Sequence, residues 1–242
     1  LDDGYLHEDV RTIWGEGLRP YTVEAKLADN GSVVRLSAPA TSGNDKVLTT
    51  AAKPFQQTGG IRVLSGNLGK SIIKVSAVKP EHRVIEAPAL VFHSQEEMQT
   101  AFKEGRLDRD FIAVIRFQGP KANGMPELHK LTPALGVLQD RGHRIALVTD
   151  GRMSGASGKV PAAIHVTPEA LDGGMIGKLR DGDPMRLDAD KGTLEALVDA
   201  EEFAARESAA PDLSGNQFGM GRELFAGFRQ LAGRADQGAA VF

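Results

Sequence analysis

Short apolar runs alternate with glycine-rich or polar turns along most of this chain, and this pattern predicts many short strands. Residues 61–64 and 71–75 are rich in β-branched side chains, with glycines and an asparagine between them. Residues 185–187 and 193–198 form a second such pair around a polar segment, residues 188–192. We therefore expect two hairpins in this part of the fold.

Two further apolar runs show no polar alternation, which indicates strands that are buried on both faces. They span residues 111–117 and 145–148. Each is followed by a segment of glycine, proline and small polar residues, over residues 118–126 and 149–159. Because a buried strand holds the start of its loop rigidly, these two loops are the first candidates for a catalytic or binding site.

Helix signals flank these strands. Ser94 and Glu97 match a capping box, which opens a helix that should end at Gly105. Pro126 predicts a helical turn that begins at the proline and contains Glu127. Further helices are expected over residues 132–140, from a cap at Asp199 with Glu202, and over residues 222–231.

Strands and helices do not alternate strictly, so a doubly wound parallel sheet is disfavoured. The pattern favours an α/β fold: a β-barrel or a two-layer β core, flanked by helices. We expect an interdomain linker with the first strands over residues 1–53, including one strand at most before residue 32. A catalytic barrel domain with helices should follow over residues 54–210, and a helical tail packed on it over residues 211–242.

Composition narrows the class of protein. The chain has 242 residues, is 41% hydrophobic and carries a net charge of −3 with both signs interspersed. No nucleic-acid or polybasic membrane surface is predicted, and no apolar run approaches the roughly 18 residues of a membrane-spanning helix. The acidic residues at its beginning are unlike the basic start of a signal peptide, so we expect a cytoplasmic protein.

The chain has no cysteine. This excludes disulfides, thiolate nucleophiles and iron–sulfur clusters held by its own residues. It begins with Leu1, and its opening residues look like the middle of a chain, so we expect a piece of a longer polypeptide.

Glu127 and Ser154 are the candidate reactive groups of the two loops. If the two apolar strands are neighbours, their loops open at the same edge and the two groups converge on one site. On spacing alone, Glu127 more simply complements a helix N-terminus, and Ser154 is more simply a turn hydroxyl. The alternative is a carboxylate ligand for a hard divalent cation beside a serine base or nucleophile. No histidine lies in the serine loop, so a metal ion is the more natural activator.

The end of the second loop could cradle a phosphate group. Gly155, Ser157, Gly158 and Lys159 offer backbone N–H groups, a hydroxyl and an ammonium. The spacing is not that of a Walker A loop, so the signal is weak by itself.

Several of these stretches resemble the signatures of the dihydroxy-acid and phosphogluconate dehydratase family. The matching stretches, in the order and spacing of the family, are Val63-Leu-Ser-Gly-Asn-Leu-Gly69, Gly119-Pro-Lys-Ala-Asn-Gly-Met-Pro-Glu127, Thr149-Asp-Gly-Arg-Met-Ser-Gly-Ala-Ser-Gly-Lys159 and Ile164-His-Val-Thr-Pro-Glu-Ala170. The resemblance covers the chain from about Pro54 to its end. Gln118 before Gly-Pro, Gly155-Ala-Ser157 and the ending Gln217-Phe-Gly-Met-Gly-Arg-Glu-Leu-Phe225 favour the phosphogluconate branch.

The resemblance implies a fold and a reaction. The fold is the family's C-terminal swivelling domain, a β/β/α-type β-barrel flanked by helices. The reaction is that of a hydro-lyase: 6-phospho-D-gluconate loses water to give 2-dehydro-3-deoxy-6-phosphogluconate, in the Entner–Doudoroff pathway. By motif position, Ser154 is the base that takes the C2 proton and Glu127 is a Mg²⁺ ligand. We expect Ser157 and Lys159 to contact the substrate phosphate.

The resemblance also implies partners outside this chain. An iron–sulfur cluster and most Mg²⁺ ligands belong to an N-terminal cluster-binding domain of the same polypeptide, so the chain alone should be inactive. The full-length enzyme should be a homodimer. Two alternatives remain: a family member that acts on dihydroxy acids or on another sugar acid, and a non-catalytic swivelling domain that binds an anion or a partner.

Overall fold

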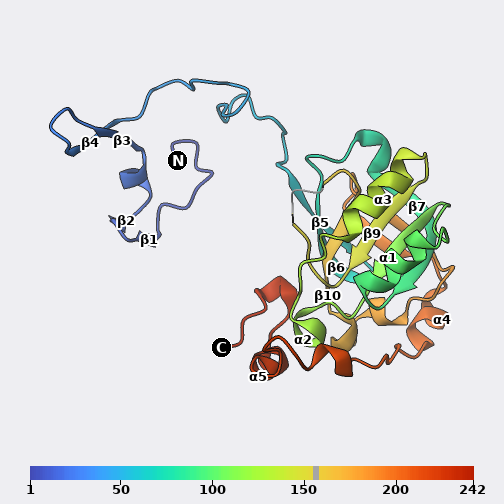
Figure 1. Ribbon diagram of the computed structural model, residues 1–242. Helices are drawn as coiled ribbons and strands as arrows, with labels where there is room; N and C mark the ends of the chain where they lie inside the picture. The colour runs from blue at the N-terminus through green and yellow to red at the C-terminus, as the bar shows by residue number, and fades with distance from the viewer. Residues whose placement is uncertain (155–157) are drawn as a thin grey trace. The chain divides into compact units, whose positions relative to one another are not determined.

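The computed structural model describes residues 1–154 and 158–242 (Figure 1). The chain divides into two compact units, Leu1–Gln57 and Thr58–Phe242. Among the described residues, no helix combines the length and the apolar character that crossing a membrane requires.

The first unit consists of two small antiparallel ribbons and has no buried residue. Its elements are β1 (Arg11–Thr12), β2 (Gly15–Glu16), a 3-10 helix (Arg19–Tyr21), β3 (Val23–Leu27) and β4 (Val33–Ser37). The expectation of at most one strand before residue 32 is therefore wrong, because β1 and β2 are too short to show a hydrophobic period. Trp14 stacks on Tyr21 with ring centroids 4.6 Å apart, and the Arg35 guanidinium lies 4.9 Å from the Trp14 ring.

The second unit is built on a closed barrel, which confirms the predicted α/β barrel fold (Figure 1). The strands pair around the barrel in the order β10-β6-β5-β12-β11-β7-β8-β9. Their bounds are β5 Ile61–Gly66, β6 Gly69–Lys74, β7 Val84–Phe92, β8 Phe111–Ile115, β9 Ile145–Thr149, β10 Ala162–Thr167, β11 Pro184–Asp188 and β12 Thr193–Ala196. Both predicted hairpins are present, as β5–β6 and β11–β12.

The helices largely follow the predicted caps. Their bounds are α1 Gln95–Lys103, α2 Pro120–Asn123, α3 Leu131–Asp140, α4 Ala200–Ala205 and α5 Ala226–Leu231. The Ser94 hydroxyl accepts a hydrogen bond from the Glu97 N–H at 3.1 Å, and Asp199 caps α4 in the same way. The C-terminal helix begins only at Ala226, and Arg222 lies in the turns before it, so the predicted start was four residues too early.

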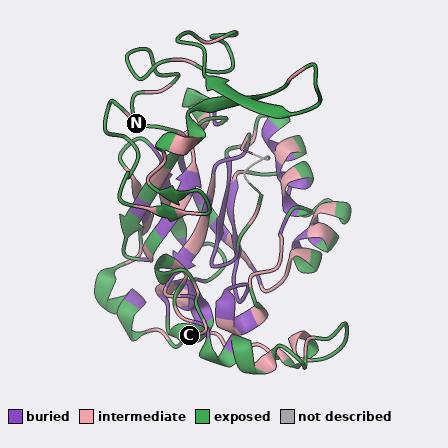
Figure 2. Ribbon diagram, turned by 90° about the vertical axis from the view of Figure 1, so that its left-hand side faces the viewer, coloured by how far each residue is buried: buried purple, intermediate pink, exposed green. Residues whose placement is uncertain are grey.

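Two clusters of buried side chains explain why β8 and β9 lack polar alternation. Ile112 and Val114 point into the barrel, whereas Ala113 and Ile115 lie in a second cluster that includes residues of α1 and α3. All five residues of each strand are buried, and Figure 2 shows buried strands in the interior with exposed residues on the outer sides of the helices, among other places. The continuous apolar runs therefore reflect burial on both faces of the barrel wall, as predicted.

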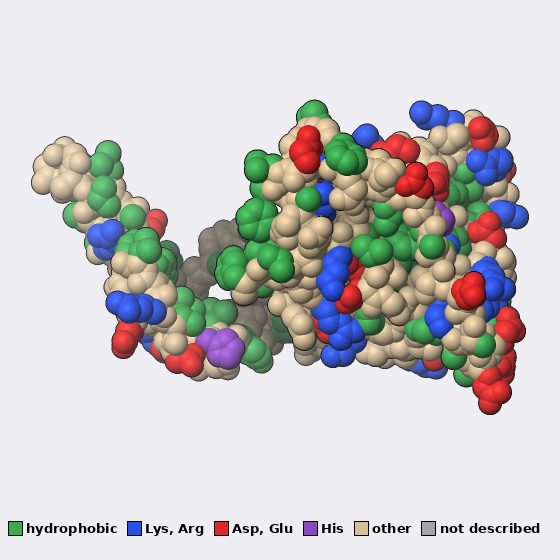
Figure 3. Space-filling view, turned by 90° about the horizontal axis from the view of Figure 1, so that it is seen from below, with side chains coloured by type: hydrophobic (Ala, Val, Ile, Leu, Met, Phe, Trp, Pro, Cys, Tyr) green, Lys and Arg blue, Asp and Glu red, His purple; other side chains and the backbone are tan. Residues whose placement is uncertain are grey.

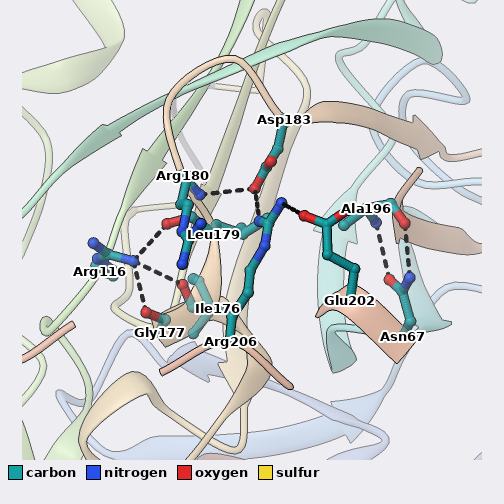
Figure 4. A network of polar contacts seen from close by, with 10 residues as sticks. All are labelled: Asn67, Arg116, Ile176, Gly177, Leu179, Arg180, Asp183, Ala196, Glu202 and Arg206. Carbon is teal, nitrogen blue, oxygen red and sulfur yellow. Dashed lines mark hydrogen bonds and ion pairs between the residues drawn. The ribbon is translucent and has the colours of Figure 1, made fainter. Parts of the chain in front are cut away.

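A network of arginines fixes the segment between β10 and β11 against the barrel (Figure 4). The buried Arg116 donates to the carbonyl oxygens of Gly177 at 2.8 Å and Leu179 at 2.9 Å. Arg206 forms an ion pair with Asp183 at 2.6 Å. The loops at this end of the barrel are therefore held by specific polar contacts as well as by apolar packing.

Candidate functional site

The site lies where the two buried strands end. β8 and β9 are parallel neighbours, with Ile115 paired to Thr149 in the last register position. Their following loops therefore leave the barrel from the same end, as the sequence predicted. The loop after β8 carries Glu127, and the loop after β9 carries Ser154.

Asp150 holds these loops together. Its side chain is fully buried, and its carboxylate accepts hydrogen bonds from the N–H groups of Phe117 (3.1 Å), Gln118 (2.9 Å) and Ala170 (2.9 Å). Burial raises the pKa of Asp150, although these N–H donors act in the opposite direction. One side chain thus joins the ends of β8, β9 and β10.

Close backbone approach requires glycine at two positions of these loops. A Cβ atom on Gly151 would lie 2.6 Å from the Gln118 Cβ, and one on Gly119 would lie 1.7 Å from the Glu169 Oε2. Larger side chains at either position would push the two loops apart. The glycines of the motifs are therefore explained by packing between the loops.

Glu127 and Ser154 are in direct contact. The Ser154 N–H donates to the Glu127 Oε1 at 2.5 Å, and the Arg152 Nη1 donates to the Glu127 Oε2 at 2.7 Å. Glu127 and Arg152 also form an isolated parallel β-bridge. The fold therefore brings the two predicted residues together, and Arg152 is a partner that the sequence did not single out.

Glu127 does not lie at the start of a helix, so the predicted helical turn at Pro126 is wrong. The preceding turn, α2, ends at Gly124, whose φ is +70°, and the next helix begins at Leu131. Glu127 lies between them in the β-bridge, because its carboxylate is held by donors from the serine loop. The simple interpretation as a helix N-terminal acid is therefore wrong as well.

Ser154 is exposed and lines a small pocket of about 40 Å³. The other described residues of its lining are Lys74, Met153, Gly158, Val160, Ala162 and Ile164. The Lys74 side chain passes close to Gly158, where an added Cβ would lie 3.6 Å from the Lys74 Cδ. The cation nearest to this pocket in the described structure therefore comes from β6, which sequence spacing did not indicate.

The structure gives partial information on the two residues predicted to contact phosphate, Ser157 and Lys159. Ser157 lies outside the described residues. The Lys159 ammonium pairs with Asp140, at the end of α3. Lys159 is not one of the described residues that line the Ser154 pocket. Its contact with the substrate phosphate stays a prediction.

Glu169 is a buried acid that the sequence did not identify as part of the site. Its Oε1 accepts a hydrogen bond from the Lys121 N–H at 2.8 Å, whereas its Oε2 has no hydrogen-bond partner among the described residues. Burial, more than the nearby Asp150, raises the pKa of Glu169 to about 7. Glu169 therefore links the start of α2 to the segment after β10, in a form that is partly protonated at neutral pH.

The chain is similar to proteins of known families over most of its length. Residues 46–239 match the family model described as dihydroxy-acid/6-phosphogluconate dehydratase C-terminal. The chain is 61% identical over 241 residues to phosphogluconate dehydratase of Rhizobium meliloti (strain 1021) and 56% identical over 239 residues to that of Escherichia coli (strain K12). These alignments cover 100% and 99% of this chain but 40% of each relative.

A more distant relative belongs to the other named branch. Dihydroxy-acid dehydratase of Sulfurisphaera tokodaii is 38% identical over 209 residues, which is 85% of this chain and 34% of the relative. The chain thus spans about two fifths or less of the length of the curated relatives described here.

Proposed function

Because this chain belongs to the dihydroxy-acid/6-phosphogluconate dehydratase family, as its C-terminal domain, we propose that it forms part of a phosphogluconate dehydratase. The reaction is the dehydration of 6-phospho-D-gluconate to 2-dehydro-3-deoxy-6-phosphogluconate, a step of the Entner–Doudoroff pathway. The observation that carries this proposal is the contact between Glu127 and Ser154 at the end of two buried strands. The higher identity to phosphogluconate dehydratases, 61% against 38%, favours this branch over a dihydroxy acid as substrate.

Ser154 acts as the base in this proposal. The C2–H bond breaks as the serine oxygen, in its alkoxide form, takes the proton, and the electron pair forms the C2=C3 double bond. The C3 hydroxyl leaves with its bonding pair and takes up the proton from the serine hydroxyl, so water is released and the alkoxide is restored. The resulting enol then transfers its C2 hydroxyl proton to C3, which gives the 2-keto-3-deoxy acid. Because a proton next to a carboxylate is only weakly acidic, both a strong base and a cation at the carboxylate are needed.

Glu127 fits a Mg²⁺ site as one ligand. Each of its oxygens accepts one hydrogen bond, and a carboxylate has about four lone-pair sites, so acceptor capacity remains for a cation. Among the described residues, no group of three or more His, Cys, Asp or Glu side chains is placed to hold a metal ion. The other ligands must then come from outside this part of the chain. When bound, the ion would polarise the substrate carboxylate and make the C2 proton more acidic.

The residues of this chain do not fit an iron–sulfur cluster, because it has no cysteine. We propose that an N-terminal domain of the same polypeptide holds the cluster. The relatives are longer than the part that this chain matches, which leaves room for such a domain. We also propose that the full-length enzyme is a homodimer. A cytoplasmic location fits the reaction, because phosphorylated sugar acids do not cross membranes freely.

The decisive experiment replaces the base. In the full-length protein that carries this chain, Ser154→Ala should lower kcat by at least about a thousandfold, because the group that takes the C2 proton in this proposal is lost. Binding of 6-phosphogluconate, measured by calorimetry, should stay within about threefold of the unaltered protein. Ser214→Ala, which removes an exposed hydroxyl elsewhere, is the matched control. Turnover by Ser154→Ala at the normal rate would remove this residue from the base role.

A further inference from the structure

Two arginines of the C-terminal segment converge beneath the loop that leads to Glu127. The Arg222 Nη2 donates to the Asn123 Oδ1 at 2.5 Å, and its Nε donates to the Asn216 carbonyl at 2.5 Å. The Arg229 Nη1 donates to the Arg222 carbonyl at 2.9 Å. These contacts tie the segment before and within α5 to the α2 turn, and Figure 1 shows the two helices side by side.

These two positive charges are not neutralised within the described chain. Their hydrogen bonds go to carbonyl and amide oxygens, and neither guanidinium forms an ion pair with a described residue. Arg229 is only 8% exposed, and desolvation together with the charge of Arg229 lowers the pKa of Arg222. By contrast, Arg206 is paired with two carboxylates. A buried cation without an anion is costly, so this pair is suited to receive one.

Arg222 and Arg229 line a cavity. It has a volume of about 520 Å³, within the usual range for small-molecule sites. Its remaining described lining is mostly apolar and comprises Pro120, Asn123, Gly124, Met125, Met220, Phe225, Phe228, Ala232, Ala239 and Val241. The underside of the molecule, on which α5 lies, carries hydrophobic side chains next to Lys and Arg (Figure 3). The Arg222 Nη1 and the Arg229 Nε donate to no described residue, so N–H groups remain for a ligand.

The cavity and the candidate active site are linked by one short chain segment and by Arg152. Met125, which lines it, precedes Glu127 by two residues, so their Cα atoms are at most about 7 Å apart. Arg152 bridges the two places, since its Nε donates to the Met125 carbonyl at 2.8 Å and its Nη1 pairs with Glu127. The residues that line the cavity and the predicted reactive residues are therefore neighbours at the end of β8, which is the premise for one ligand that contacts both.

We propose that Arg222 and Arg229 bind the phosphate group of the substrate, while Glu127 and Ser154 act on its carboxylate end. The inference rests on the proposed function, because it takes a phosphorylated sugar acid as the ligand. A guanidinium presents paired N–H groups that match phosphate oxygens, and two of them match its double negative charge. Lys159 has its ammonium paired with Asp140 and is therefore the weaker candidate for the same role.

The test compares three single variants of the full-length protein. Arg222→Gln should raise the KM for 6-phosphogluconate roughly ten- to hundredfold, with kcat within about threefold, because charge-assisted hydrogen bonds to phosphate are lost. Gluconate, which lacks the phosphate, should bind equally to this variant and to the unaltered protein when used as a substrate or competitive inhibitor. Arg234→Gln removes an exposed arginine from the same segment and should change neither value. Lys159→Ala tests the alternative phosphate contact in the serine loop, and it should raise the KM less than Arg222→Gln does.

A direct binding measurement accompanies the kinetics. Inorganic phosphate should compete with 6-phosphogluconate in the unaltered protein and do so at least tenfold less effectively in Arg222→Gln. Arg222→Lys replaces the glutamine variant in this test if Arg222→Gln does not fold. It keeps the charge but loses the paired N–H groups, so its KM should rise less than that of Arg222→Gln.

Some results would overturn the phosphate site. An unchanged KM in both Arg222 variants would do so, as would an equal loss of gluconate and 6-phosphogluconate binding. A rise in KM confined to Lys159→Ala would move the phosphate to the serine loop. If Ser154→Ala is inactive while Arg222→Gln behaves normally, the phosphate site alone fails. If Ser154→Ala is fully active, the proposed function itself fails.

Discussion

The loops around Asp150 and the C-terminal segment around Arg222 both border the candidate site, but they are held in opposite ways. Asp150 is fully buried and accepts three backbone N–H bonds from two parts of the chain. The C-terminal segment is made of turns, two 3-10 helices and one short α-helix, and Leu224 and Phe225 are exposed there. Only Arg229 and Ala232 of this segment are buried.

This difference matches the different demands of proton abstraction and of phosphate recognition. Proton abstraction needs groups held within fractions of an ångström, and a buried carboxylate with several backbone donors provides that rigidity. Recognition of a phosphate by guanidinium groups tolerates a less rigid support, because charge attraction varies gently with distance. The structure thus places Glu127 and Ser154, the proposed reactive pair, in the loops that Asp150 joins, and Arg222 and Arg229 in the more weakly packed C-terminal segment.

The largest effect should come from removing the buried carboxylate. Asp150→Ala leaves three buried N–H groups without partners, at about 1–3 kcal/mol each, so we expect a loss of about 3–9 kcal/mol in the free energy of unfolding. Asp150→Asn should cost less, because its carbonyl oxygen keeps part of the acceptor capacity. Denaturant unfolding of the 242-residue chain measures both. A loss below about 1 kcal/mol for Asp150→Ala would show that the loops are held by other contacts.

A smaller effect should come from Glu169 and should depend on pH. Its pKa is raised from 4.5 to about 7, so the folded state holds more protons than the unfolded state between these values. Stability should therefore fall as the pH rises from about 4.5 to 7, by up to about 3 kcal/mol. Glu169→Gln is neutral throughout and should lack this decrease. Thermal unfolding of both proteins from pH 4.5 to 8 gives the difference, and parallel curves would refute the raised pKa.

The smallest effect should come from the surface of the C-terminal segment. Leu224 is 75% exposed, so Leu224→Ser should change the free energy of unfolding by no more than about 0.5 kcal/mol. The same denaturant measurement tests it. A loss comparable to that of Asp150→Ala would mean that this segment is as firmly packed as the loops, and the contrast between the two regions would disappear.

Much of the barrel could be predicted because its signals are local. The unbroken apolar runs of β8 and β9 identify strands buried on both faces, and the Ser94 cap identifies the start of α1. Where local signals conflict with distant contacts, the prediction failed. Pro126 favours a helix start, but the Arg152 guanidinium and the Ser154 N–H hold Glu127 in a bridge instead.

The candidate site was predicted in part. Residue type and loop position singled out Glu127 and Ser154, and the parallel pairing of β8 and β9 brings them together. Asp150 follows a strand, where a carboxylate often only organises a turn, and its donors come from segments that the sequence cannot place beside it. Glu169 could have been suspected from one signal, an acid next to a proline inside a family motif.

The sequence by itself determined the strands, the helix caps, the lack of any cysteine ligand and the family of this chain. Each of these depends on composition or on residues that are close together in the sequence. Only the tertiary structure decided which distant groups share a site. Arg222 meets Asn123 across 99 positions, and Asp150 meets Phe117 across 33. Such contacts depend on how the barrel closes and how the C-terminal segment packs on it. A local pattern of hydrophobic and polar residues does not specify which distant residues come into contact.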